Sequence, residues 1–226
     1  MFGTMILVST IVFISATGRE TSAIPLGLYC AILIGGHVTG AHYNPAVTLA
    51  VVIGRKHFDK LDLAILFYMV PQFIGGFLGF LIPKFFVDYF IVEDYGIPLL
   101  PYLNSDGDYA NFNALLVEIW ATFIFTLVWL CVTNPDTYHT DIGAINGACV
   151  VIGLWVGINI ASKVSGAALN PAVGLSLNVC SKVFYSNSET LGKVWIYLVG
   201  PWVGSILSGA FYAFFHHLQC GATTNP

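Results

Sequence analysis

One tripeptide occurs twice in the chain, first as Asn44, Pro45 and Ala46 and again as Asn170, Pro171 and Ala172. Each copy follows a glycine-containing turn and precedes a short apolar run. Asn is a favoured N-cap, Pro is favoured at the first helical position, and the apolar residues extend the helix. Each copy therefore predicts a helix of about ten residues, which is too short to cross a bilayer alone.

The composition places these two short helices in a membrane. Of 226 residues, 57% are hydrophobic and only 9% are charged, whereas roughly a quarter are charged in soluble domains. The sequence thus predicts one all-α, polytopic membrane domain over residues 1–226. Inside a bilayer, an interrupted segment is tolerated only where protein buries it or where it lines a cavity. We expect the two half-helices to meet mid-membrane, with both Asn amides pointing at one place.

Charge and cysteine usage exclude other classes of function. The net charge of −4 is small and argues against a nucleic-acid partner. The five cysteines show no metal-binding or thiol-exchange spacing, so we interpret them as small hydrophobic residues and predict no metal and no cofactor. The chain contains no nucleophile paired with a base, no paired carboxylates and no phosphate-binding glycine loop. An enzyme is not predicted.

Long apolar runs predict six spanning helices, at residues 1–17, 22–36, 61–86, 112–132, 142–162 and 190–216. The half-helices run from 45 to about 53 and from 171 to about 180. The first run is interpreted as a spanning helix rather than a signal peptide, because it has no basic leader. Pro71 is expected to kink the third helix. An acidic connection without Lys or Arg covers residues 87–111, and a polar tail begins at residue 217.

The two halves of the chain repeat, over residues 1–86 and 111–217. Asn44 and Asn170 are 126 positions apart, and Gly75 and Gly204 are 129 apart. Three spans per half is an odd number, so the second half must enter the membrane inverted. The basic residues near Arg55 predict that this connection, and with it both termini, lies inside, whereas the acidic connection lies outside.

These motifs carry a resemblance to a known family. The two Asn-Pro-Ala boxes, with residues 36–42 before the first, resemble the aquaporins, that is, the major intrinsic protein family. Residues 68–76 resemble the third helix of the family and residues 195–204 its sixth. The resemblance covers essentially the whole chain. It implies the aquaporin fold of six transmembrane helices and two half-helices in an inverted repeat.

The resemblance also implies a function. We expect a passive channel for water and small neutral solutes, in which the two Asn side chains donate to passing water while the half-helix dipoles repel cations. Glycine-rich helix faces, with the precedent of the family, imply a homotetramer with one pore per protomer. Two alternatives stay open: a preference for glycerol, ammonia or hydrogen peroxide, and a non-conducting structural subunit of a membrane assembly. The sequence does not say which membrane holds the protein.

The resemblance places the narrowest part of the pore at four residues, read by their offsets from the two Asn: Ile24, Ile158, Ala167 and Val173. All four are apolar. The family usually has Arg where this chain has Val173, so this neck lacks a fixed positive charge and its donors. Tyr197 and Leu198 in the last helix fit neither of the two main subtypes of the family, the strict water channels and the aquaglyceroporins. Lys163 could supply a replacement charge, although a solvated lysine is the simpler interpretation.

Glu118 stands alone in an apolar helix, where a carboxylate needs hydrogen-bond partners. The resemblance implies that it accepts hydrogen bonds from a pore loop, and we expect the loop before Asn44. The repeat equivalent of Glu118 would be residue 0, so no carboxylate is expected at the second loop. His37 and His42 flank the first turn, and packing in the loop is favoured for them over pore lining or pH gating.

Overall fold

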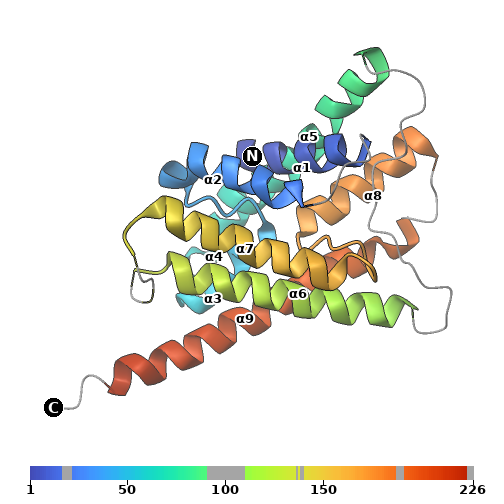
Figure 1. Cartoon of the computed structure of the whole chain (residues 1–226). Helices are drawn as coiled ribbons and strands as arrows, with labels where there is room; N and C mark the ends of the chain where they lie inside the picture. Colours follow the sequence, from blue (N-terminus) through green and yellow to red (C-terminus); the bar gives the residue numbers. More distant parts are fainter. Residues whose placement is uncertain (17–21, 91–109, 136, 138–139, 187–190, 223–226) are drawn as a thin grey trace.

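The computed structural model describes residues 1–16, 22–90, 110–135, 137, 140–186 and 191–222, and all regular elements among them are helical (Figure 1). The predicted connection after the first helix and most of the predicted acidic connection lie outside these residues. In chain order, the helices are α1 (Phe2–Ala16), α2 (Ala23–Thr39), α3 (Pro45–Gly54), α4 (Leu61–Ala64), α5 (Val70–Phe90), α6 (Ala110–Thr133), α7 (Gly143–Ala161), α8 (Pro171–Tyr185) and α9 (Val194–Ala222). Short 3-10 turns at Phe58–Lys60 and Leu191–Lys193 precede α4 and α9.

Four helical stretches of the described chain are long and apolar enough to cross a membrane: Phe58–Phe86, Ala110–Thr133, Gly143–Ala161 and Leu191–His216. The other two predicted spans, α1 and α2, have 15 and 17 residues. At a rise of about 1.5 Å per residue they are somewhat shorter than a hydrocarbon core of about 30 Å.

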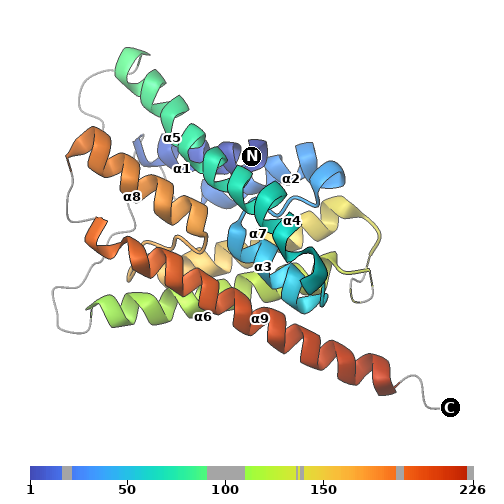
Figure 2. The same ribbon diagram turned by 180° about the vertical axis from the view of Figure 1, so that it is seen from behind.

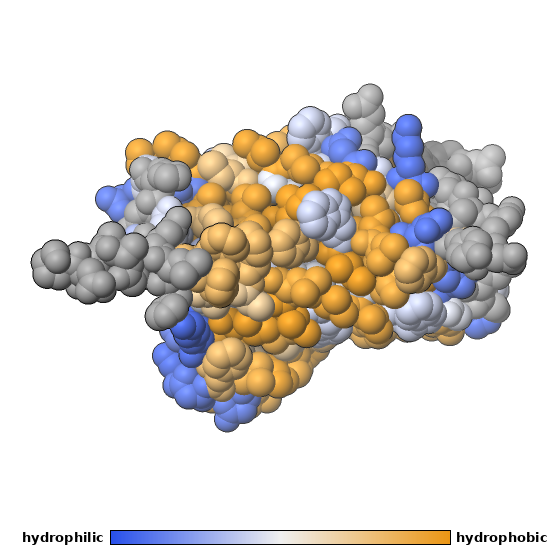
Figure 3. Space-filling view, turned by 90° about the horizontal axis from the view of Figure 1, so that it is seen from below, coloured by the Kyte–Doolittle hydropathy of each residue, from blue (hydrophilic) through white to orange (hydrophobic). Residues whose placement is uncertain are grey.

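The outer surface is apolar over a broad middle zone. Figure 3 shows hydrophobic residues covering the centre of one face, with hydrophilic residues gathered toward its ends. The most exposed large apolar side chains of α6 and α9 include Phe112, Trp120, Leu207 and Phe214. Apolar side chains exposed over such an area are unfavourable in water and favourable in lipid, so this surface fits a membrane-spanning protein.

The half-helices α3 and α8 enter the bundle from opposite ends and meet near its centre (Figure 2). Each contacts a long helix of the other half of the chain, since α3 lies against α9 and α8 against α5. The first half-helix has the predicted length, but α8 runs to Tyr185 rather than to about Cys180. The run from Ser181 to Tyr185 contains no helix breaker, and the helix ends where Ser186 takes a left-handed conformation.

Two glycines set the closest helix contacts at corresponding places in the two halves. A Cβ atom on Gly75 of α5 would lie 2.3 Å from the carbonyl oxygen of Met1, against α1. A Cβ atom on Gly204 of α9 would lie 2.5 Å from the carbonyl oxygen of Ile119, against α6. Both distances are too short for any side chain. The two glycines lie 129 positions apart, as the predicted repeat requires, but the repeat and its division at the acidic connection stay predictions.

Two more predictions concern the third and the last long helices. The third long helix changes to π geometry at Ile65–Met69, directly before Pro71. Because Pro has no N–H and its ring crowds the carbonyl four residues earlier, a wider turn at this point accommodates it. A kink angle at Pro71 stays a prediction. The last helix continues to Ala222, so the predicted polar tail from residue 217 begins as helix.

Candidate functional site

The two Asn-Pro-Ala copies fold alike. Asn44 and Asn170 both have extended backbone, with φ of −150° in each. The Oδ1 atom of Asn44 accepts from the N–H of Ala46 at 2.8 Å, and that of Asn170 accepts from Ala172 at 2.9 Å. Both prolines occupy the first helical turn. The predicted N-caps are therefore confirmed in both half-helices.

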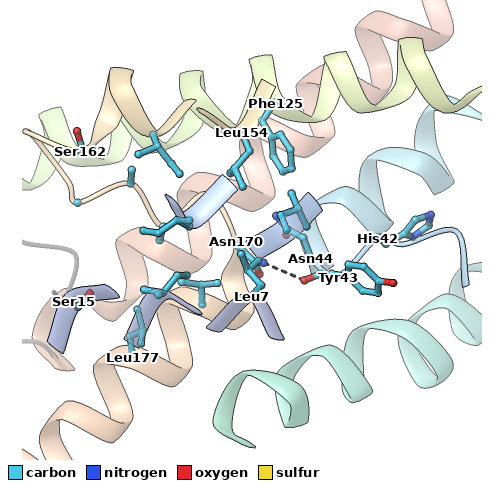
Figure 4. Close-up of a pocket in the computed structure, with 18 residues that line it drawn as sticks. Leu7, Ser15, His42, Tyr43, Asn44, Phe125, Leu154, Ser162, Asn170 and Leu177 are labelled. Carbon is cyan, nitrogen blue, oxygen red and sulfur yellow. Dashed lines mark hydrogen bonds between the residues drawn. The ribbon is translucent and has the colours of Figure 1, made fainter. Parts of the chain in front are cut away.

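The amide nitrogens of the two Asn connect the two loops. Nδ2 of Asn44 donates to the carbonyl of Leu169 at 2.9 Å. Nδ2 of Asn170 donates to the carbonyl of Tyr43 at 3.2 Å, the bond that is dashed in Figure 4. Each Asn thus bonds to the residue before the other Asn. A carboxamide nitrogen carries two hydrogens, and these bonds use one of each pair. The second hydrogen of each Asn is left for another acceptor.

The loops before the two Asn share an unusual backbone. Left-handed φ values occur at Ala41 (53°) and Tyr43 (50°) and at the equivalent Ala167 (61°) and Leu169 (48°). Non-glycine residues disfavour this conformation by about 1–2 kcal/mol each, so neighbouring contacts must hold the loops in place. Gly40 and Gly166 begin both runs with φ of 70° and 86°, which glycine adopts without strain.

Glu118 supplies that support to the second loop, and the prediction that it serves the first loop is wrong. Its carboxylate accepts from Ser165 Oγ at 2.5 Å and from the N–H groups of Ala168 and Leu169, both at 2.9 Å. Glu118 is fully buried on α6. The reason lies in the repeat: the loop after α7 folds back onto helices of its own half, which include α6 and α9.

Tyr197, whose role the sequence analysis missed, completes this support. Its hydroxyl donates to the carbonyl of Ser165 at 2.8 Å, and its side chain is fully buried. A Cβ atom on Gly174 would lie 2.4 Å from Tyr197 Cβ, so glycine after Val173 lets α8 and α9 approach closely. The signal available in the sequence was a tyrosine hydroxyl inside an apolar helix, which needs a hydrogen-bond partner there.

The first loop is held differently. Thr4 Oγ1 donates to the carbonyl of Tyr43 at 3.2 Å, and the Tyr43 hydroxyl donates to the carbonyl of Ala31 at 3.0 Å. Gly3 and Gly35 make room for the Tyr43 ring and hydroxyl, since a Cβ on either would lie within 2.6 Å of it. Among the described residues, no carboxylate accepts a hydrogen bond from this loop. The predicted absence of a carboxylate thus belongs to the first loop, not the second.

One cavity joins both Asn residues to the predicted neck. It has a volume of about 80 Å³, and Asn44, Asn170 and all four predicted neck residues line it. Those four are Ile24 from α2, Ile158 from α7, Ala167 from the second loop and Val173 from α8. A water molecule needs at least roughly 10–15 Å³ of cavity volume, so this cavity is large enough for several water molecules. The four residues selected by their offsets in the sequence thus come from four separate segments, and the fold brings them to one cavity.

Polar groups line the two ends of this cavity. His42 lies at one end and Ser15 and Ser162 at the other (Figure 4). His42 Nδ1 lies 3.2 Å from Thr48 Oγ1, and its ring contacts Tyr68 and Trp129. His42 thus both packs in the loop, as predicted, and lines the cavity.

Two other residues considered in the sequence analysis, His37 and Lys163, do not line the cavity. His37 and Lys163 are both exposed, and neither lines the cavity that contains the two Asn. The simpler interpretation of Lys163, a side chain that reaches solvent, fits its exposure.

Comparison with known proteins gives the family. The family model described as "Major intrinsic protein" matches residues 2–212. The chain belongs to the major intrinsic protein family. A relative in this family, the glycerol uptake facilitator protein-like 6 of Lactiplantibacillus plantarum, is 30% identical over 91% of this chain and 91% of its own.

Other members are similarly distant. Aquaporin-4 of Rattus norvegicus is 31% identical over 79% of this chain, which corresponds to 50% of its own length. The crystal structure of the aquaglyceroporin from Plasmodium falciparum superposes with a TM-score of 0.79 over 98% of this chain and 96% of that one, at 22% identity. The last comparison shows the shared aquaporin fold. A major intrinsic protein with these relatives is an integral, multi-pass membrane channel for water or small solutes.

Proposed function

We propose that water and small neutral solutes cross this channel passively through the cavity between the two loops, past Asn44 and Asn170. One observation carries the proposal: both Asn residues and the four apolar neck residues line a single cavity. The proposal involves no covalent chemistry and no cofactor. The solute exchanges hydrogen bonds with bulk water for hydrogen bonds with the wall and then returns to water.

The two Asn residues orient the solute at the centre of the pore. One N–H of each Asn is used by the other loop, which leaves one N–H of each to donate to a solute oxygen. The N-termini of α3 and α8 place positive potential at the same point. A water held this way turns its own hydrogens outward, which interrupts a proton wire and disfavours cations.

The neck sets the preference among solutes. Ile24, Ile158, Ala167 and Val173 offer no side-chain donors, so a polar solute pays a desolvation penalty there. We therefore expect modest water flux, and small, weakly hydrated neutral solutes favoured over polyols. In the family scheme that penalty would be offset by an Arg at the place of Val173.

The assembly is also a proposal. Many of the described glycines contact other helices of the same chain, as Gly75 and Gly204 do, so they do not argue for contacts between copies. A homotetramer rests on the precedent of the family. Native mass spectrometry of the detergent-solubilised protein should give a fourfold mass, and a monomer that conducts would contradict the tetramer alone.

The rate at which vesicles change volume after an osmotic step tests the proposed function. Lipid vesicles that contain the purified protein should shrink faster than protein-free vesicles after an increase in external osmolarity. Stopped-flow light scattering follows the shrinkage. Separate runs with glycerol, with hydrogen peroxide and with methylamine at high pH give the permeability to each solute and so rank the solutes. Permeability equal to that of protein-free vesicles for water and every solute would favour the non-conducting structural subunit instead.

A further inference from the structure

Ser15, in the last turn of α1, has a buried hydroxyl to which the proposed passage assigns no role. Its Oγ is buried and has no hydrogen-bond partner among the described residues, and the residue lines the cavity that contains both Asn. Two other hydroxyls of the same helix behave differently, since Ser9 and Thr10 both donate to the carbonyl of Ile6. Back-bonding of this kind is the usual state of a hydroxyl inside an apolar helix. Within the described part of the chain, Ser15 is therefore a donor and acceptor without a partner at the cavity wall.

Its position relative to the neck gives it a role. Ser15 and Ser162 lie at the end of the cavity that is opposite His42 (Figure 4), and Ser162 comes from the segment directly after α7. The neck residue Ile24 belongs to the first turn of α2, the helix that follows Ser15 in the chain, and Ile158 belongs to the last turn of α7, four positions before Ser162. A solute that arrives from this end loses part of its water shell against apolar side chains. An unpaired hydroxyl beside them replaces part of that shell.

We infer that Ser15, with Ser162 from the other half of the chain, forms a hydroxyl site that hydrogen-bonds the solute where it enters the apolar neck. This inference rests on the proposed function, which it deepens. A serine hydroxyl both donates and accepts and carries no charge. The site therefore fits neutral solutes whose polar atom does the same, namely water and small hydroxylated molecules. It supplies hydrogen bonds at the end of a neck that lacks the donors of an arginine, and it adds no charge.

Vesicle permeability of serine variants tests the site. Ser15→Ala should lower water permeability, and glycerol permeability if the wild type passes it, by roughly three- to tenfold, the factor expected for one lost hydrogen bond. Ser15→Thr keeps the hydroxyl and should recover most of the flux. Ser9→Ala is the matched control, because Ser9 lies on the same helix, bonds its own backbone and does not line the cavity. It should leave the flux unchanged.

Thiol labelling keeps the test decisive if the alanine variant fails to fold. Ser15→Cys should lose most of its water permeability after treatment with 2-aminoethyl methanethiosulfonate, while the wild type and Ser9→Cys should lose little. Unchanged flux in Ser15→Ala, or an unblocked Ser15→Cys, within a conducting protein would overturn the inference and leave the proposed function standing. A wild type that conducts neither water nor solute would overturn both.

Discussion

Asn44 and Asn170 bind each other's loops: each donates its Nδ2–H to the backbone carbonyl of the residue that precedes the other, at 2.9 and 3.2 Å. Each also caps its own half-helix through Oδ1. One side chain therefore holds a helix start, a contact between the two halves of the chain and a donor toward the cavity. Loss of either Asn should affect stability and permeation together.

Replacement of Asn170 by Ala tests this coupling. The variant loses an N-cap worth about 0.5–2 kcal/mol and a cross-loop hydrogen bond worth about 0.5–1.5 kcal/mol. Its thermal midpoint in detergent should fall clearly, and proton leak into vesicles, followed with a pH-sensitive dye, should rise. Asn159→Ala is the control, because Asn159 is exposed and bonds only within α7. Equal behaviour of the two variants would contradict the role given to Asn170.

Glu118 should be the most sensitive carboxylate of the described chain. Glu118→Ala leaves three donors of the second loop without their acceptor, at a cost of roughly 1–3 kcal/mol each. Glu118→Gln keeps one acceptor oxygen and should fall between the wild type and Glu118→Ala in unfolding temperature. Asp59→Asn, at an exposed carboxylate, should change nothing. A stable, fully permeable Glu118→Ala variant would show that the loop does not need this support.

Tyr197→Phe isolates a single hydrogen bond to the same loop. The variant loses the hydroxyl that donates to the Ser165 carbonyl and leaves that buried acceptor unpaired, so we expect about 1–3 kcal/mol of destabilisation. Tyr29→Phe removes a comparable bond to the carbonyl of Ala144 at an exposed site and should cost much less. Chemical unfolding of the two variants measures the loss of unfolding free energy in each. Equal losses in the two variants would rule out a special role for Tyr197.

The close helix contacts predict a matched pair of glycine effects. Gly75→Ala and Gly204→Ala each drive a Cβ atom against a backbone carbonyl, which cannot yield as a side chain can, and overpacking typically costs about 1–3 kcal/mol. Similar drops in thermal stability for both would support the repeat. Gly143→Ala is the control, because nothing lies within 4 Å of the added Cβ. If that control falls as far as the other two, the contacts are not the cause.

Local sequence rules explain how much of this fold could be predicted. Asn followed by Pro predicts the start of both half-helices, because helix capping depends on neighbouring residues alone. The four cavity-lining neck residues were located by offsets from Asn44 and Asn170 that the family resemblance supplied, not by local rules. The choice of loop for Glu118 could not be predicted this way, because two equivalent loops exist and the carboxylate itself does not indicate which one it meets. The left-handed conformations of Tyr43 and Leu169 oppose local preference and depend on tertiary contacts.

Ser15 shows the same limit. In the sequence it is a serine inside an apolar run, and a hydroxyl there most simply bonds its own helix, as Ser9 and Thr10 do. Only the packed bundle shows that its Oγ is buried at a cavity wall without a hydrogen-bond partner among the residues that the structure describes.

The central claim is that solutes pass through the neck at Val173, and permeability of Val173→Arg tests it most directly. The arginine adds a bulky cation to the neck, so solutes larger than water should permeate more slowly, while Val183→Arg on the exposed side of the same helix should match the wild type. Stopped-flow scattering with water alone, glycerol and methylamine at high pH gives the comparison. A wild type that passes a solute larger than water, with Val173→Arg selectively slowing that solute, is the predicted result. A conducting wild type whose water and solute permeabilities are unchanged by Val173→Arg would contradict the account.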